Sequence, residues 1–361
     1  MSNKRKEDRA QYRKKVEENL PEKLDFPIFI KRHSLRYGIN PGSPAAFYAE
    51  KGASGPTMAN FDVLQEGRGL GYINLGDMDL GLAVVKSLHD SRWGQAAYCI
   101  VKHEMPSGVG LAKNTGVAFD YAWGSDPLSS FGGVHVTSGI VYEYVARELV
   151  DKAKNVEVIF APSFSNGALD ILKQRQDLRV VEINNFDEAV VDNGLDYKRV
   201  SGGMLVQPRW QTRIELPSDL ECVSDRQPTS EEVQAALLQW RVAGFTRSNA
   251  VVIGNHYRVH GIGSGQRSRI DAARMAIDLA NGRGGTNSCF GAEETFMASD
   301  AYMPATDVVE AAHKAGVTGI VFPLGSIKDA DVLAAANSHG MTMLATRSPG
   351  QKDSERCFTH R

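Results

Sequence analysis

The sequence has few cysteines and no excess of either charge. Its 361 residues include 4 cysteines, at positions 99, 222, 289 and 357, and no two of them form a Cys-x-x-Cys pair. This spacing indicates neither a zinc knuckle nor a disulfide framework, and it favours a reducing cytoplasm. Lysine and arginine number 41 against 43 acidic residues, so the net charge of −2 predicts no general attraction to nucleic acid or to anionic membranes.

Several familiar segments and motifs are also absent. Residues 1–20 mix both charge signs without an apolar core, so they are neither a secretory signal nor a membrane anchor. The chain has no phosphate-binding P-loop, no nucleophile elbow and no His-Glu-x-x-His motif. The zinc-deaminase pattern is missing because His103 is followed directly by Glu104 and no cysteine pair exists. We therefore expect no metal, and any anionic ligand must be bound by local groups.

What the sequence does contain is an alternation of apolar strands and amphipathic helices, typical of an α/β protein. The expected strands are 96–103, 156–162, 178–183, 319–325 and 341–346, with a hairpin over 249–263 turning at Gly254-Asn255, and the expected helices are 139–153, 167–175, 230–245, 268–281, 306–316 and 329–340. Thr229 or Ser230 is placed to cap the helix at 230–245. The expected organisation is a polar arm (1–24), a first unit (25–205), a connector with a helix (206–246) and a second unit (247–361).

The two units share an arrangement of apolar strand, proline-bearing turn and amphipathic helix. The turns are "VKHEMPSG" (101–108) and "ASDAYMPA" (298–305), which hints at an internal duplication. Such turns lie at strand ends, where open α/β sheets usually bind ligands. In the first turn, Lys102 and His103 follow a buried strand, and a lysine there needs water or a partner for its ammonium group. An ordinary solvated strand end is the competing interpretation.

Nine segments in order resemble the AICAR transformylase domain of the bifunctional purine-biosynthesis enzyme. They are "LRYGINP" (35–41), "GYINLGD" (71–77), "VKHEMPSGVG" (101–110), "DPLSSFGG" (126–133), "EVIFAP" (157–162), "RSNAVV" (247–252), "GIGSGQRSRID" (261–271), "ASDAYMPATD" (298–307) and "RCFTH" (356–360). The resemblance implies two tandem cytidine-deaminase-like α/β units. It also implies a homodimer with active sites at the interface.

The implied reaction transfers a formyl group from 10-formyltetrahydrofolate to the 5-amino group of 5-aminoimidazole-4-carboxamide ribonucleotide. That amine is a poor nucleophile, so a base is needed, and an imidazole suits this task at neutral pH. By resemblance, His103 is the candidate base, Lys102 stabilises the oxyanion, and Asn249 polarises the formyl oxygen. Consecutive strand residues point to opposite faces, so Lys102 and His103 share a site only if the strand has ended.

The resemblance also implies the binding residues. Those around the ribonucleotide would be Arg36, Tyr37, Asn74, Gly132, Glu157, Arg269, Arg356, Phe358 and His360, with the three arginines as phosphate ligands. Those around the folate would be Leu128, Tyr302, Pro304 and Asp307.

Departures from the family pattern leave alternatives open. Met105 and Ser107 differ from the usual Asn-Pro-Cys-Gly, Met303 and Ala305 differ from "DAFFPF", and Gly42-Ser43 replaces His-Gln. A formyltransferase acting on a related amine, or a non-catalytic nucleotide-binding dimer, remains possible on sequence alone. Because "LRYG" begins at Leu35, we also expect no cyclohydrolase domain and therefore no ring closure.

Overall fold

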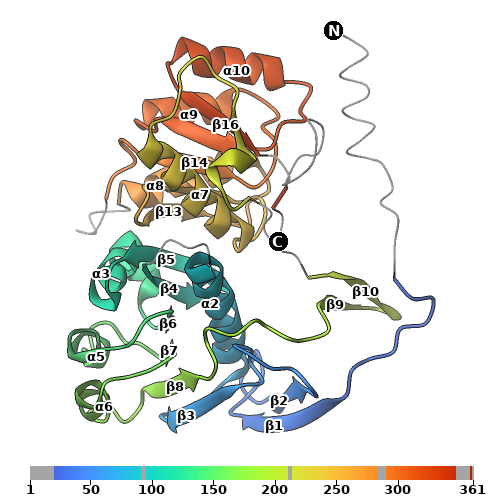
Figure 1. Ribbon diagram of the computed structural model, residues 1–361, viewed down its shortest axis with the longest axis vertical. Helices are drawn as coiled ribbons and strands as arrows, with labels where there is room; N and C mark the ends of the chain where they lie inside the picture. Colours follow the sequence, from blue (N-terminus) through green and yellow to red (C-terminus); the bar gives the residue numbers. More distant parts are fainter. Residues whose placement is uncertain (1–19, 91–94, 210–213, 283–289, 347–357, 360–361) are drawn as a thin grey trace.

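Two α/β units, each built on one mixed sheet, make up the body of the protein in the computed structural model, which describes residues 20–90, 95–209, 214–282, 290–346 and 358–359 (Figure 1). The first unit lies below the second in Figure 1. Among the described residues, no helix is long and apolar enough to cross a membrane.

The first unit is a six-stranded sheet covered by helices. The strands, in spatial order, are β3 (Phe61–Gln65), β8 (Arg179–Ile183), β7 (Val158–Ala161), β6 (Val134–Thr137), β4 (Ala96–Lys102) and β5 (Met105–Ala112). The helices are α2 (Tyr72–Asp90), α3 (Thr115–Ser125), α4 (Pro127–Ser130), α5 (Glu143–Val150) and α6 (Asn166–Leu172). Strands β6, β7 and β8 are parallel, and the other neighbours are antiparallel.

The second unit repeats this topology. Its strands, in spatial order, are β11 (Leu220–Cys222), β16 (Thr342–Thr346), β15 (Gly319–Phe322), β14 (Phe296–Ser299), β12 (Val251–Gly254) and β13 (Val259–Gly263). Its helices are α7 (Ser230–Gly244), α8 (Arg269–Ala280), α9 (Asp307–Lys314) and α10 (Asp329–Ser338), with a 3-10 turn, η1 (Pro217–Asp219). Strand order and direction match the first sheet position by position, which indicates an internal duplication.

The two turns that suggested the duplication are nevertheless not equivalent. The "VKHEMPSG" segment joins β4 to β5, whereas "ASDAYMPA" follows β14. By position in the sheet, β14 corresponds to β6 and β12 corresponds to β4. The pattern of strand, polar turn and helix is very common in α/β chains. The two segments share this pattern although they lie at non-equivalent positions of the repeat.

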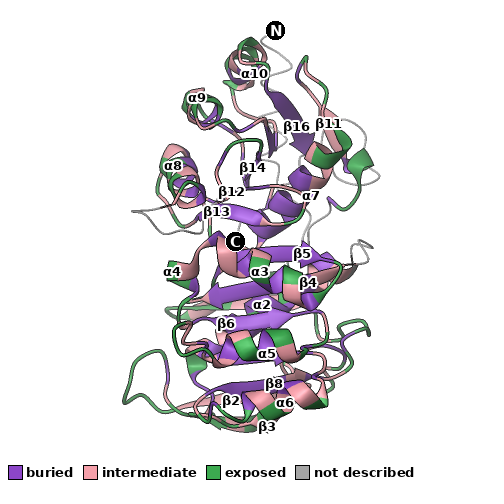
Figure 2. Cartoon of the chain, turned by 90° about the vertical axis from the view of Figure 1, so that its left-hand side faces the viewer, coloured by how far each residue is buried: buried purple, intermediate pink, exposed green. Residues whose placement is uncertain are grey.

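The two units pack edge to edge through β5 and β13, which are adjacent in Figure 2. The Leu111 N–H donates to the Tyr257 carbonyl oxygen at 2.7 Å, and the Ser125 hydroxyl donates to the Val259 carbonyl oxygen at 2.6 Å. The guanidinium of Arg258 lies over the rings of Tyr121 and Phe290, at 4.7 Å and 3.4 Å from their centroids. These contacts fix the orientation of the first unit's hairpin relative to the second unit.

The predicted connector, 206–246, contributes η1, β11 and α7 to the second unit. Helix α7 begins with a capping box, in which the Thr229 hydroxyl accepts from the Glu232 N–H and the Glu232 carboxylate accepts from the Thr229 N–H. Its residues 235–244 are buried, and Trp240 joins a core cluster that also includes Met78 of α2. Strand β11 pairs with β16, and α7 packs against β12 and β14, so the second sheet with its covering helix begins before residue 247.

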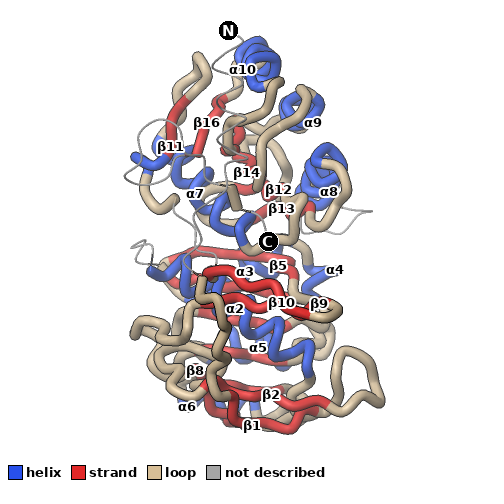
Figure 3. Tube along the Cα trace, turned by 90° about the vertical axis from the view of Figure 1, so that its right-hand side faces the viewer, coloured by secondary structure: helices blue, strands red, loops and turns tan. Residues whose placement is uncertain are grey.

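Two further hairpins flank the first unit. One is formed by β1 (Phe29–Leu35) and β2 (Ala45–Glu50), and the other by β9 (Leu195–Val200) and β10 (Gly203–Pro208). Both lie outside the six-stranded sheet, and Figure 3 shows them on the surface of the lower unit. The chain after β1 leads to Arg36 and Tyr37, so this hairpin helps to place the first of the expected site residues.

Candidate active site

A two-residue turn between β4 and β5 carries His103. Strand β4 ends at Lys102, β5 begins at Met105, and these two residues pair across the hairpin. The φ angles of His103 and Glu104 are 54° and 57°, both in the left-handed region. Within the predicted turn segment 101–108, Met105–Gly108 instead form the start of β5. Proline is tolerated there because β5 is at the edge of its sheet and a register shift follows directly after Pro106, at Ser107.

A polar cavity of about 290 Å³ lies beside this turn. It is lined by Tyr37, Gly71, Ile73, Asn74, Asp77, Lys102, His103, Phe131, Gly132, Asn155 and Glu157. The structure thus brings together six of the residues that the sequence suggested, from five separate segments: Tyr37, Asn74, Lys102, His103, Gly132 and Glu157. The cavity is of the size and polarity that a small polar ligand requires.

Hydrogen bonds fix the polar groups of this cavity. The Asn74 amide donates to Glu157 Oε2 at 2.9 Å, and the Arg179 guanidinium lies 3.7 Å from the same oxygen. The Lys102 ammonium donates to the Phe131 carbonyl oxygen at 2.6 Å. Gly132 has a φ of 72°, and a Cβ there would stand 3.9 Å from Lys102 Nζ. The Glu157 carboxylate and the Lys102 ammonium therefore face a shared space.

Asp77 is a residue of this site that sequence reasoning missed. It is 3% exposed, and its two carboxylate oxygens accept hydrogen bonds from the backbone N–H groups of Glu104 at 2.6 Å and His103 at 3.3 Å. Burial raises the pKa of the Asp77 carboxyl to about 6, against the lowering effect of these two N–H groups. Its spacing was the available signal, because residues three apart share a helix face and Asn74 was already a candidate.

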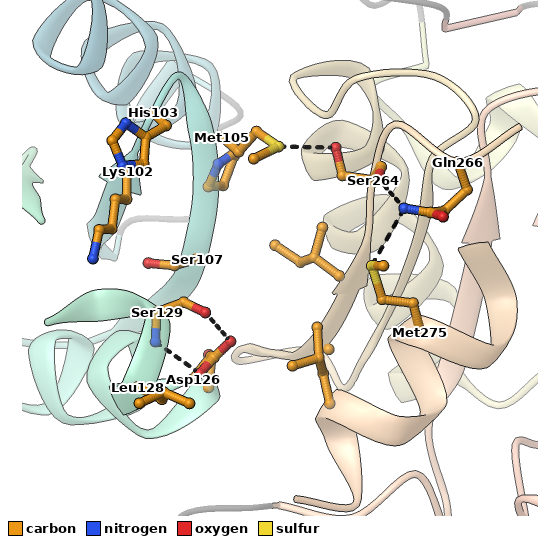
Figure 4. Close-up of a pocket in the computed structure, with 15 residues that line it drawn as sticks. Lys102, His103, Met105, Ser107, Asp126, Leu128, Ser129, Ser264, Gln266 and Met275 are labelled. Carbon is orange, nitrogen blue, oxygen red and sulfur yellow. Dashed lines mark hydrogen bonds between the residues drawn. The ribbon is translucent and has the colours of Figure 1, made fainter. Parts of the chain in front are cut away.

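A larger and more apolar cavity of about 540 Å³ lies on the other side of the turn, between the two units (Figure 4). Its lining includes Met105, Pro106, Leu128, Ile262, Met275 and Leu279, together with Ser107, Ser125, Asp126, Ser129, Gly261, Ser264 and Gln266. Lys102 and His103 line this cavity as well, so they belong to both. The Ser264 hydroxyl donates to Met105 Sδ at 3.4 Å, which connects the two walls.

Asn249 and Arg269 form a separate cluster in the second unit. The Arg269 guanidinium donates to Asn249 Oδ1 at 2.7 Å and to Ser299 Oγ at 3.0 Å, and it forms an ion pair with Asp300. Asn249 Nδ2 donates to the Gln266 carbonyl oxygen at 2.9 Å. Arg269 is 8% exposed and Asp300 is fully buried, so the charge of Arg269 is already neutralised by a carboxylate. Neither Asn249 nor Arg269 lines either of the two cavities.

The other expected site residues lie in several places. Arg36 is exposed, with its guanidinium 5.2 Å from the ring centroid of Tyr37. In the second unit, the rings of Tyr302 and Phe358 meet edge to face at 6.0 Å. Pro304 and Asp307 are exposed at the start of α9. Arg356 and His360 lie outside the described residues.

Two findings bear on what the site binds. Within the described part of the chain, no group of three or more His, Cys, Asp or Glu side chains could hold a metal ion. Residues 5–279 match a family described as the AICARFT/IMPCHase bienzyme. The matched range includes both cavities, the Lys102-His103 pair and the Asn249-Arg269 cluster.

Proposed function

The chain belongs to the AICARFT/IMPCHase bienzyme family of purine biosynthesis, and on that premise we propose that it transfers a formyl group from 10-formyltetrahydrofolate to 5-aminoimidazole-4-carboxamide ribonucleotide. The proposal concerns the transformylase activity, because the residues that support it suit acyl transfer to an amine. We further propose that it acts as a cytoplasmic homodimer.

One observation carries the proposal: Lys102 and His103 are the shared wall of a polar cavity and an apolar cavity. Transfer between two bound molecules requires the reacting atoms to meet, with the catalytic groups at the meeting point. A ribonucleotide in the polar cavity and a pterin in the apolar cavity would bring an amine and a formyl group to opposite sides of this pair. The difference in polarity between the two cavities matches the two substrates.

The chemistry assigned to the pair follows from its groups. The 5-amino nitrogen attacks the formyl carbon, and His103 takes the amine proton as the new C–N bond forms. The Lys102 ammonium stabilises the negative charge that develops on the formyl oxygen. When the tetrahedral intermediate collapses, the bond to the folate N10 breaks and N10 takes up a proton, which releases tetrahydrofolate and the formylated nucleotide. The atoms and charges balance without any further reactant.

The polar cavity supplies groups for the nucleotide base. The Glu157 side chain is 44% exposed and is held by a hydrogen bond from Asn74. Its carboxylate can therefore accept a hydrogen bond from the carboxamide amino group of the nucleotide. Gly132 leaves space beside Lys102 for the reacting amine. Arg36 and Tyr37, which lies in the cavity lining, are proposed on the ribose phosphate side. We also keep Phe358, Arg356 and His360 as proposed nucleotide ligands.

The residues of the second unit are proposed to have different roles. Because Arg269 already pairs with Asp300 and holds Asn249 Oδ1, we assign it to the orientation of Asn249 rather than to the phosphate. Asn249, Tyr302, Pro304 and Asp307 would complete a site together with the first unit of a second copy. Leu128, in the apolar cavity, is proposed to contact the folate.

Activity with a related amine is less well supported than the proposed reaction. The departures Met105 and Ser107 line the apolar cavity, whereas neither lines the polar cavity proposed for the amine. They are therefore expected to alter the fit of the formyl donor more than the choice of acceptor.

The test is a steady-state assay of tetrahydrofolate release with the ribonucleotide, with a panel of other amines, and with each substrate omitted. We expect release that depends on the ribonucleotide and a formylated, open-ring nucleotide as the first product. Release that is equal with and without the ribonucleotide would contradict the proposal. Chromatography of the products also shows whether ring closure follows.

A further inference from the structure

The turn that holds His103 has a backbone that its residues do not favour. His103 and Glu104 both have a positive φ, at 54° and 57°. For residues other than glycine this conformation brings Cβ close to a carbonyl oxygen, and two-residue turns of this kind prefer Asn-Gly. Other groups must therefore hold the turn in place.

Helix α2 supplies those groups from the neighbouring layer. Asp77 Oδ1 accepts from the Glu104 N–H at 2.6 Å and Oδ2 accepts from the His103 N–H at 3.3 Å. At the preceding position, a Cβ on Gly76 would stand 2.8 Å from Glu104 Oε1. The helix surface is thus shaped for the turn, with space from a glycine and two acceptors from one carboxylate.

A comparison with the second unit shows that this contact is specific to the first. Helix α7 occupies the place of α2 in the repeat, and its buried Gln239 contacts the loop between β12 and β13. There the side chain donates through Nε2 to the carbonyl oxygens of Asn255 at 2.8 Å and Arg258 at 3.4 Å. Residues 255–258, all within the described part, have no positive φ. Only the first unit combines a left-handed turn with a buried carboxylate that binds its N–H groups.

A buried carboxylate is costly to keep charged unless it is hydrogen-bonded. Asp77 is 3% exposed, and its two carboxylate oxygens accept hydrogen bonds from the two turn N–H groups. The histidine that they hold lines both cavities. The two hydrogen bonds that offset the cost of burying Asp77 therefore also hold the backbone of His103 in position.

We propose that Asp77 is a positioning residue for the transfer reaction, which fixes the left-handed His103-Glu104 turn and thereby holds the His103 imidazole where the two cavities meet. This inference rests on the proposed function. Asp77 itself need not touch either substrate. Its loss should therefore lower turnover more than it alters nucleotide binding.

The first experiment compares Asp77→Asn with Asp79→Asn, a matched change of charge on an exposed residue of the same helix. An amide cannot accept from both N–H groups with two oxygens, so we expect kcat to fall by at least about tenfold, with the nucleotide KM within about threefold of wild type. Asp79→Asn should stay within about twofold for both constants. A normal kcat in Asp77→Asn would overturn the inference.

The second experiment separates turn geometry from any other role of the carboxylate. Glycine adopts a positive φ without strain, so Glu104→Gly should stabilise the turn without help from Asp77. We expect the double variant Asp77→Asn, Glu104→Gly to approach the kcat of Glu104→Gly alone. A folded double variant that remains at least about tenfold below Glu104→Gly would overturn the inference. The same comparison serves if Asp77→Asn alone does not fold.

Amide hydrogen exchange keeps this inference distinct from the proposed function. In Asp77→Asn, exchange at His103 and Glu104 should accelerate at least about tenfold, while Asp79→Asn leaves it unchanged. If wild type transfers no formyl group, the proposed function fails, and exchange alone then decides whether Asp77 holds the turn. Unchanged exchange in Asp77→Asn would contradict the positioning role in either case.

Discussion

His103 follows Lys102 directly in the sequence, and yet both side chains line the same two cavities. In a continuous strand they would point to opposite faces of the sheet. Strand β4 ends at Lys102, and the φ of 54° at His103 redirects the chain at that point. Two adjacent residues of different chemistry can therefore act on one reacting centre.

This arrangement predicts that both residues are needed for turnover. His103→Ala and Lys102→Ala should each lower kcat by at least about a hundredfold, because each removes a group that acts in the transition state. The measurement is initial-rate formyl transfer at saturating substrates. Lys113→Ala is the control, since Lys113 is exposed just beyond β5. Near-normal turnover in either active-site variant would show that both are ordinary solvated residues at the end of a strand.

A second prediction concerns Arg269 and stability. Removal of its guanidinium leaves the fully buried Asp300 without that ion pair, so Arg269→Ala should lower the free energy of unfolding by about 3–5 kcal/mol. Urea denaturation measures this. The control is Arg274→Ala in the same helix, whose side chain is 67% exposed and should change stability by less than about 0.5 kcal/mol. Unchanged stability with a raised nucleotide KM would instead support a direct phosphate ligand.

A third prediction follows from the burial of Asp77. Its pKa of about 6 lies above the ordinary value of 3.8, so near pH 6 the folded chain binds a proton that the unfolded chain does not. As the pH falls from 7 to 5, the unfolding free energy of wild type should therefore rise relative to that of Asp77→Asn, by about 1 kcal/mol. Denaturant titrations at the two pH values test this. A difference between the two proteins that is the same at both would contradict it.

Much of the architecture could be predicted from local patterns. The apolar periodicity indicated β4, β7, β8, α5 and α6 of the first unit and most elements of the second, but not α2, α3, β3, β5 or β6. Thr229 or Ser230 indicated the start of α7, and the structure shows Thr229 as its N-cap. Periodicity does not say which elements pack together. The assignment of α7 to the second unit therefore required the structure, since it depends on contacts between residues distant in sequence.

The candidate site could likewise be predicted only in part from the sequence. The resemblance to the transformylase family indicated six of the residues that line the polar cavity, because each lies in a segment that carries the resemblance. The position of the turn within 101–108 was not predicted, because Pro106 usually marks a turn, whereas here it lies in an edge strand. The ion pair of Arg269 with Asp300 joins residues 31 positions apart. Such a contact has no local signal, and it changes the role that the arginine can play.

A fourth prediction concerns assembly. Lys102 lines the cavities of the first unit, whereas Asn249 lies in a separate cluster of the second unit. If one active site takes these residues from different chains, inactive Lys102→Ala and Asn249→Ala proteins should regain activity when they are refolded together. Random mixing gives at most about one quarter of wild-type activity, because half the dimers are mixed and each has one intact site. Mixed dimers that stay inactive would mean that each chain carries a complete site.

The central claim is that a formyl group is transferred directly between two bound molecules at the wall formed by Lys102 and His103. The most direct test is a single-turnover experiment with 10-formyltetrahydrofolate labelled in the formyl carbon, with enzyme in excess and the ribonucleotide present. We expect the label to appear on the nucleotide with wild type, and to remain on the folate over the same period with His103→Ala. Label that stays on the folate with wild type, or that is transferred equally fast by both proteins, would contradict the claim.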